Sequence, residues 1–259
     1  MSGETAKKFN KILPLLGAIG ILVFAAAIVL SMSVNPAPPP VSEPSVDLSS
    51  QPSSSIENSE PSGVNDTLIP LTDEELFTGS AFIGNSCVER LFVQGYGLQA
   101  DFLSGVGLTV HSFFTDSPAR LDRTVADLLT DGRQYTRIFI LFGINEVGTD
   151  PILFIEKYGQ LIDHIQAYQP SAQIYVQAIL PVSRAAHERN TYMVNNDNIR
   201  MFNQYILDMT VQKQVNFINT FDALADSEGF LPDDVSSDGI HLSKDYNQIW
   251  INYLKEQVK

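Results

Sequence analysis

The sequence has one cysteine, four histidines and few basic residues among its 259 positions. A single cysteine excludes an internal disulfide and any cysteine-rich zinc or iron–sulfur site. The histidines form no HExxH pattern, so we expect no metal and no cofactor. The sequence contains 16 lysines and arginines but 30 acidic residues, which gives a formal net charge of -14. This charge would repel nucleic acid and anionic lipid surfaces. The hydrophobic content of 44 % is nevertheless enough to bury one sizeable core.

One stretch is both long and uncharged. It runs from Ile12 to Val34 and follows a cluster of three lysines within residues 1–11. As a helix it would measure about 34 Å, which is enough to cross a bilayer core. The lysines on one side predict that residues 1–11 are cytoplasmic and that the chain after Val34 is extracellular. A cleaved signal peptide is the alternative, although its apolar region is normally about 7–15 residues long.

Residues 35–65 consist mainly of proline, serine and acidic residues, with almost nothing to bury. This composition predicts an extended, disordered linker. Its "PAPPP" stretch could instead form a polyproline II binding motif. The sequence therefore predicts four parts: a cytoplasmic N-terminus (1–11), a single-pass transmembrane helix (12–34), a linker (35–65) and a catalytic domain (66–259).

From about Leu68 onward, short apolar runs alternate with amphipathic segments. Five runs have strand length, and several lack polar alternation, as in strands covered on both faces; they are residues 81–85, 100–107, 137–143, 173–180 and 214–219. Helical spacing follows Ser117-Pro118 and Asp150-Pro151, recurs around residues 199–209, and places Tyr246, Ile249, Trp250 and Tyr253 in a last helix. This alternation predicts a five-stranded parallel sheet in a three-layer α/β/α sandwich.

Small polar residues follow these runs. In an open α/β sheet the ligand site lies beyond the carboxyl ends of the strands. Ser86 follows the first run, Gly107 the second and Asn145 the third, while Asp238 and His241 lie in a glycine-containing loop before the last helix. Each one alone is well explained as a turn or cap residue. Together, at one sheet edge, they predict a single site.

The residue types predict nucleophilic catalysis. Ser86 at a strand-to-helix turn would lie near a helix N-terminus, where partial positive charge favours an alkoxide. The spacing of Asp238 and His241 lets the carboxylate bind one ring nitrogen while the other acts as a base. An oxyanion would be stabilised by the backbone N–H groups of Ser86 and Gly107 and by the side-chain amide of Asn145.

Four sequence blocks resemble the signature blocks of the SGNH, or GDSL-like, hydrolases. They read "FIGNSC", "SGVGLTV", "ILFGINEVG" and "SDGIHLS". The four signature residues of the family correspond to Ser86, Gly107, Asn145 and His241, with Asp238 three positions before the histidine. The resemblance implies a flavodoxin-like three-layer fold and serine-dependent hydrolysis of acyl esters without a metal.

The resemblance covers roughly residues 78–257 but has two departures. The family usually has Gly-Asp-Ser in the first block, where this chain has Asn85, and Gly-x-Asn-Asp in the third, where it has Glu146. Neither position belongs to the family's triad, so the catalytic set is intact, but the loss of a carboxylate beside Ser86 puts the rate in question. Cys87 is interpreted as a small buried hydrophobic residue, with a role as the nucleophile as a minor alternative.

These observations predict a membrane-anchored, extracellular serine esterase. Its substrate would be a small-molecule or polysaccharide ester, and the location favours O-acetyl groups on a cell-wall or capsular polysaccharide. Two alternatives stay open at this point. One is acyl transfer to a sugar hydroxyl, and the other is a non-catalytic glycan-binding module on the same fold, for which Asn85 is the best support.

Overall fold

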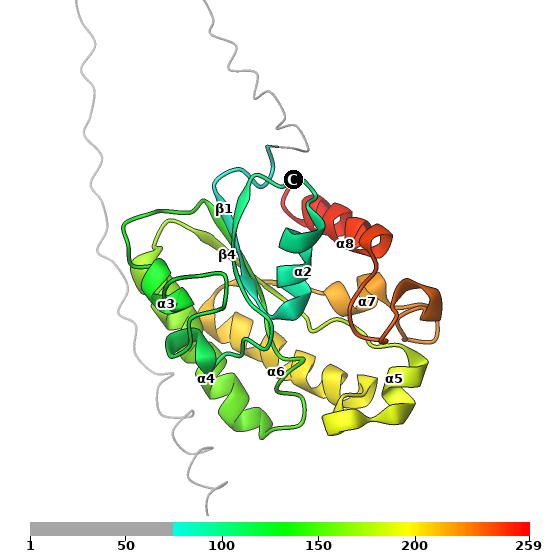
Figure 1. Ribbon diagram of the computed structural model, residues 1–259. Helices are drawn as coiled ribbons and strands as arrows, with labels where there is room; N and C mark the ends of the chain where they lie inside the picture. Colours follow the sequence, from blue (N-terminus) through cyan, green and yellow to red (C-terminus); the bar gives the residue numbers. More distant parts are fainter. Residues whose placement is uncertain (1–74) are drawn as a thin grey trace, which may run out of the picture. The chain divides into compact units, whose positions relative to one another are not determined.

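The computed structural model describes residues 75–259 (Figure 1). The cytoplasmic segment, transmembrane helix and linker predicted for residues 1–65 lie outside the described residues, as does the start of the predicted catalytic domain. Within the described part of the chain, no helix has both the length and the hydropathy needed to span a membrane.

Five parallel strands form one sheet in the order β2-β1-β3-β4-β5. The strands are β1 (Ser80–Gly84), β2 (Ala100–Ser104), β3 (Arg137–Leu141), β4 (Gln173–Gln177) and β5 (Asn216–Ile218). The predicted five-stranded parallel sheet is confirmed. The connection from β1 leads to β2 on one side of the sheet, whereas the connection from β3 leads to β4 on the other side. The loops after β1 and β3 therefore run in opposite directions, and flavodoxin-like sheets bind their ligands at this point.

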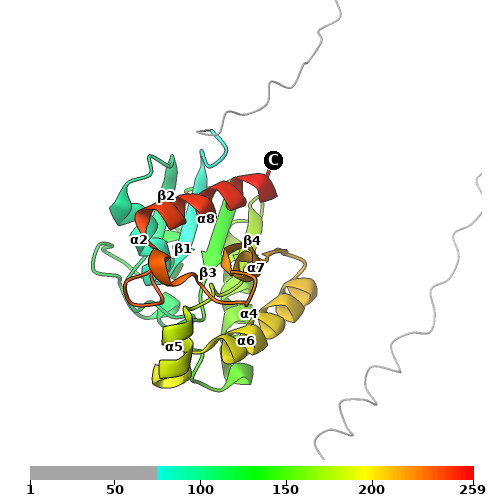
Figure 2. The same cartoon turned by 90° about the vertical axis from the view of Figure 1, so that its right-hand side faces the viewer.

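The helices cover both faces of the sheet. They are α2 (Ser86–Gln94), α3 (Val125–Leu128), α4 (Pro151–Tyr168), α5 (Arg184–Arg189), α6 (Asn196–Lys213), α7 (Thr220–Leu224) and α8 (Lys244–Gln257), with short 3-10 turns η1 (Ser112–Phe114), η2 (Thr191–Met193) and η3 (Asp233–Val235). Helices α2 and α8 lie against one face, and α3, α4 and α6 lie against the other (Figures 1 and 2). The predicted three-layer sandwich is therefore confirmed.

Alternate residues of the central strands supply two cores. Phe82 and Phe139 stack with their ring centroids 4.8 Å apart and pack in the cluster that contains Trp250 of α8. Ile83 and Ile140, the next residues along β1 and β3, belong to the cluster on the α4 and α6 side. Burial on both faces explains why these strands are almost entirely apolar in sequence.

The prediction that a helix begins at Ser117-Pro118 is wrong. The helix there, α3, begins only at Val125, where the Thr124 side chain accepts a hydrogen bond from the Asp127 N–H at 3.0 Å. Pro118 instead packs against Gly105, where an added Cβ would lie 2.7 Å from Pro118 Cβ. Tertiary packing, invisible in the helical spacing, therefore decides the conformation of this segment.

Two other helix predictions have different outcomes. Asp150 caps α4 with a 2.8 Å bond from the Ile152 N–H, and Pro151 is its first residue, as predicted. In α8 the predicted apolar face is wrong in part, because Ile249 is 48 % exposed. The buried stripe instead has helical spacing from position 247, and consists of Asn247, Trp250, Ile251 and Leu254.

Candidate active site

Ser86 is the first residue of α2, two positions after the end of β1. The preceding Asn85 is buried and caps the helix, its Oδ1 accepting a hydrogen bond from the Cys87 N–H at 3.0 Å. Gly84 permits the close approach of the neighbouring strand, because a Cβ there would lie 2.4 Å from the Leu141 carbonyl oxygen. At this first helical position the Ser86 N–H is one of the donors that a helix leaves without an intrahelical acceptor.

Ser86, His241 and Asp238 form a continuous hydrogen-bonded chain. Ser86 Oγ lies 2.8 Å from His241 Nε2, and His241 Nδ1 lies 2.7 Å from Asp238 Oδ2. The serine comes from the β1–α2 turn and the other two residues from the loop before α8, 155 residues along the chain from Ser86 to His241. The structure therefore brings together the three side chains that the sequence predicted would meet.

The surroundings of Asp238 keep it ionised. Partial burial acts to raise its pKa, but hydrogen bonds from the His241 N–H (2.8 Å), the His241 ring and the Ile240 N–H (2.9 Å) together hold the pKa well below its ordinary value. An ionised Asp238 can only accept a hydrogen bond, so it favours the form of His241 in which Nδ1 carries the hydrogen and donates to Asp238 Oδ2. His241 Nε2 is then the unprotonated nitrogen, able to accept the Ser86 hydroxyl proton.

Two residues that the sequence analysis missed hold this loop. Ser236 Oγ lies 2.8 Å from the His241 carbonyl oxygen and accepts from the Gly239 N–H at 2.9 Å. Arg189, at the end of α5, donates to the Asp238 carbonyl oxygen at 2.9 Å. The serine sits in "SSDG", which is typical of a turn, whereas no sequence signal links Arg189 to a loop 49 residues away.

The predicted oxyanion donors lie in the loops after the neighbouring strands. Gly107 is exposed with a φ of +76°, in a turn closed by the Leu108 N–H on the Gly105 carbonyl at 3.2 Å. Asn145 Nδ2 donates to the Leu108 carbonyl oxygen at 3.1 Å, which ties the third block to the second. In the described residues no hydrogen bond joins Ser86 to either residue. The strand register, with Gly84 opposite Ser104 and Leu141, places all three loops at one edge.

Cys87 and Asn85 can now be interpreted from their contacts. Burial, with a smaller contribution from the negative charge of Asp238, raises the pKa of Cys87 to about 12, so its reactive thiolate is suppressed. Asn85 provides through its amide the same cap that an aspartate would provide. Its presence leaves the contact between Ser86 and His241 in place.

Comparison with protein families decides the classification. The sequence model of the GDSL-like lipase/acylhydrolase family matches residues 82–249, more than half of the chain. The chain belongs to this family. It is accordingly an ester hydrolase of the GDSL/SGNH type, and the enzyme class predicted from the four blocks is confirmed. No curated relative matches the chain.

Solved structures share the fold of this GDSL-type hydrolase. A Streptococcus pneumonia protein named for platelet activating factor is 25% identical, with a TM-score of 0.57 over 71% of this chain and 85% of its own. A GDSL-like lipase from Bacteroides thetaiotaomicron is 15% identical, with a TM-score of 0.54 over 69% of this chain and 86% of its own. A Bacteroides fragilis protein named as an acylhydrolase is 14% identical, with a TM-score of 0.55 over 72% and 91%. These matches show that the fold is shared.

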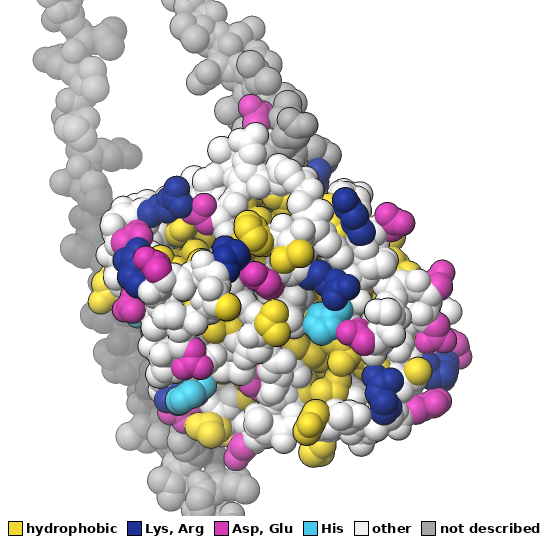
Figure 3. All heavy atoms as spheres, in the orientation of Figure 1, with side chains coloured by type: hydrophobic (Ala, Val, Ile, Leu, Met, Phe, Trp, Pro, Cys, Tyr) yellow, Lys and Arg dark blue, Asp and Glu magenta, His cyan; other side chains and the backbone are white. Residues whose placement is uncertain are grey.

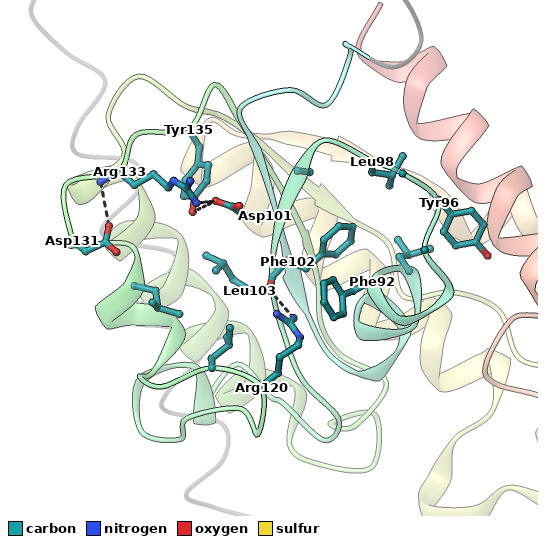
Figure 4. A pocket seen from close by; sticks show the side chains of 16 residues that line it. Phe92, Tyr96, Leu98, Asp101, Phe102, Leu103, Arg120, Asp131, Arg133 and Tyr135 are labelled. Carbon is teal, nitrogen blue, oxygen red and sulfur yellow. Dashed lines mark hydrogen bonds and ion pairs between the residues drawn. The ribbon is translucent and has the colours of Figure 1, made fainter.

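One cavity of the GDSL-type domain lies away from Ser86. It measures about 530 Å³ and follows the free edge of β2, lined by residues such as Phe92, Phe102 and Arg120 (Figure 4). Arg120 stacks over the Phe92 ring at 4.0 Å and donates to the Phe102 carbonyl oxygen at 2.8 Å. None of the predicted site residues lines it. We therefore locate the chemistry by the hydrogen-bonded chain at Ser86 and not by cavity size.

A second cavity is small, mostly enclosed and apolar. It lies beside the nucleophile position, lined by the two neighbours of Ser86, Asn85 and Cys87, and by residues such as Ile144 and Ile240. Residues 75–259 contain no group of three or more His, Cys, Asp or Glu side chains arranged to hold a metal ion. The expectation of cofactor-free chemistry stays a prediction.

Proposed function

We propose that the protein hydrolyses acyl esters with Ser86 as nucleophile, His241 as general base and Asp238 as the residue that orients His241. The observation that carries this proposal is the pair of contacts of 2.8 and 2.7 Å that links the three side chains. Membership of an acylhydrolase family supports the same reaction type.

Each step uses groups at this sheet edge. Ser86 Oγ attacks the ester carbonyl carbon while its proton passes to His241 Nε2, and the carbonyl oxygen becomes an oxyanion. The N–H groups of Ser86 and Gly107 and the Asn145 amide are the proposed donors to that oxyanion. His241 then protonates the departing alcohol, leaving an acyl ester on Ser86. A water molecule then gives a proton to His241 and attacks the acyl carbon. The bond from this carbon to Ser86 Oγ breaks, the carboxylic acid leaves, and His241 returns the proton to Ser86 Oγ.

The proposed substrate carries a short acyl group on a carbohydrate. The short acyl group is proposed together with the carbohydrate, because the small apolar cavity lined by Asn85 and Cys87, of about 10 Å³, does not include Ser86 and gives no evidence on acyl length. The carbohydrate part rests on the proposed location at the cell surface, where the predicted anchor at residues 12–34 would hold the domain.

If the anchor is correct, the full-length protein sediments with membranes, and protease added to intact cells removes its domain. A soluble full-length protein would contradict the location.

Hydrolysis of a small activated acetate ester by the full-length protein tests the function. We expect turnover by the wild type and a loss of at least about 10³-fold in kcat for Ser86→Ala and His241→Ala. Turnover that survives Ser86→Ala would contradict the mechanism. Wild-type protein that binds glycan without cleaving any ester would support the non-catalytic module, and acylated glycan among the products would support acyl transfer.

A further inference from the structure

Glu146 is the only buried acidic side chain in the described residues, with 7 % of its surface exposed. It directly follows Asn145. Its Oε1 accepts a hydrogen bond from the Val110 N–H at 2.8 Å, while its Oε2 has no partner among the described residues and is closed off from solvent. The Tyr158 hydroxyl of α4 is also buried without a side-chain hydrogen bond. Burial raises the pKa of Tyr158, and the nearby charge of Glu146 raises it further. A carboxylate in such a place is expensive to bury.

Two consecutive residues of the β3 loop hold the β2 loop. Asn145 Nδ2 donates to the carbonyl oxygen of Leu108, and Glu146 Oε1 accepts from the N–H of Val110. Gly107, just before these two residues, is exposed, and a Cβ added to it would meet nothing within 4 Å. The direction of the Gly107 N–H therefore depends on how residues 108–110 are held. The two bonds fix that segment from the loop that also carries Asn145.

We propose that Glu146 is a positioning residue for ester hydrolysis, which holds the Gly107 turn and Asn145 in the arrangement that receives the oxyanion at Ser86. This inference rests on the proposed function. Glu146 touches no reacting atom in this account. It acts through Val110 on the Gly107 N–H, and through its own backbone on the adjacent Asn145.

Other loops of this sheet are held by neutral side chains. Asn196 binds the N–H and the carbonyl of Val182 at 2.8 and 2.9 Å, and Asn203 binds those of Ile179 at 2.7 and 3.1 Å. These amides satisfy both backbone groups at a lower desolvation cost than a carboxylate. The bond from the Val110 N–H to Glu146 Oε1, at 2.8 Å, is no shorter than these amide bonds. The hold on residues 108–110 therefore needs an acceptor at position 146, which a glutamine can also provide.

Glu146→Met and Glu146→Gln test the proposal in the full-length protein. Methionine keeps the approximate volume but removes the acceptor. We expect Glu146→Met to lower kcat for an activated acetate ester by about 10–100-fold and to change KM less than about twofold. A misplaced oxyanion donor stabilises the transition state less but has little effect on substrate binding. Glutamine keeps an oxygen for the Val110 N–H, so Glu146→Gln should keep kcat within about threefold of wild type.

Gln169→Leu is the matched control. Gln169 is also buried and ties a loop, accepting from the Tyr135 N–H at 3.0 Å and donating to the Leu129 carbonyl at 2.8 Å. It does so at the amino end of β3, which is the opposite edge of the sheet. We expect this variant to lower the melting temperature while leaving kcat unchanged. If Glu146→Met does not fold, Glu146→Ala removes the same acceptor and gives a second measurement.

Affinity for a boronic acid that forms a tetrahedral adduct provides the second readout. In Glu146→Met this affinity should fall in parallel with kcat, and in Glu146→Gln it should not. Wild-type kcat in both Glu146→Met and Glu146→Ala would overturn the proposal, as would equal losses in Glu146→Gln and Glu146→Met. Failure of the proposed function is distinct, since it would appear as an inactive wild type or an active Ser86→Ala.

Discussion

At the residue scale, Glu146 and Asp238 are two acidic side chains near one sheet edge whose surroundings move their pKa values in opposite directions. Burial raises the pKa of Glu146 to about 7, despite the hydrogen bond from the Val110 N–H. Asp238 is about half exposed and receives three donors, so its pKa is low. Asp238 stays a carboxylate throughout the neutral range, as its role with His241 requires, whereas Glu146 changes charge near neutrality.

The raised pKa of Glu146 predicts a pH-dependent stability. The folded protein holds the Glu146 proton more tightly than the unfolded chain, in which glutamate titrates near about 4.3. The contribution of this group to the free energy of unfolding is therefore highest below about pH 4 and is lost as pH rises toward 7. Glu146→Gln removes the titration. We expect its stability advantage over wild type to grow by about 2–3 kcal/mol between pH 5 and pH 8.

Urea unfolding at the two pH values measures this difference. Glu188→Gln, at an exposed glutamate of α5, is the control and should differ from wild type by the same amount at both. Asp238 contributes nothing to the change, because a carboxyl with a lowered pKa contributes its stability above about pH 4 and loses it only in stronger acid. An advantage of Glu146→Gln that is independent of pH would show that Glu146 is not strained by burial.

The residue types of the site could be predicted from sequence, but their supports could not. Ser86, Asp238 and His241 stand in blocks whose composition and order indicate nucleophile, orienter and base. The contacts of Ser236 and Arg189 with the Asp238–His241 loop follow from tertiary packing and have no sequence spacing of their own. Glu146 was visible as a departure from the family block. Its burial and its bond to Val110 became apparent only in the fold.

At the element scale, the N-terminus of α2 determines where Ser86 points. Asn85 caps this helix and is almost completely buried. We expect Asn85→Ala to lower the free energy of unfolding by about 1–2 kcal/mol through loss of the cap, and to lower kcat as the turn loosens. Asn85→Asp keeps an acceptor for the Cys87 N–H, so kcat should stay within about threefold of wild type.

Urea unfolding and ester hydrolysis measured on the same samples check this prediction. Thr124→Ala removes the cap of α3, away from the triad, and should reduce stability without changing kcat. A large gain in kcat for Asn85→Asp would contradict our interpretation, because it would mean that the charge at this position, and not the cap, controls the rate.

Element positions were predictable where local signals agreed with packing. Asp150-Pro151 combines a cap with a favourable first helical residue, and α4 begins there. Ser117-Pro118 has the same local pattern, but Pro118 is used to fill the space beside Gly105. The exposed Ile249 shows in turn that an apolar residue in a helix does not by itself identify the buried face.

At the scale of the whole molecule, the parallel sheet gathers residues that are far apart in sequence. The β2-β1-β3 register places the loops with Ser86, Gly107 and Asn145 side by side. Acidic and basic side chains are interspersed on the face in Figure 3, so the overall negative charge of the chain forms no continuous acidic patch there. The sequence alone was sufficient to predict this architecture, because alternating strands and helices permit few arrangements.

The identity of the nucleophile is the central claim, and covalent labelling tests it most directly. The full-length protein is treated with a fluorophosphonate, which reacts with activated serines, and the modified peptide is sequenced by mass spectrometry. We predict a single adduct on Ser86 that is absent in Ser86→Ala and strongly reduced in His241→Ala. An adduct on the neighbouring Cys87, or ester hydrolysis that continues in protein whose Ser86 is fully labelled, would contradict the account.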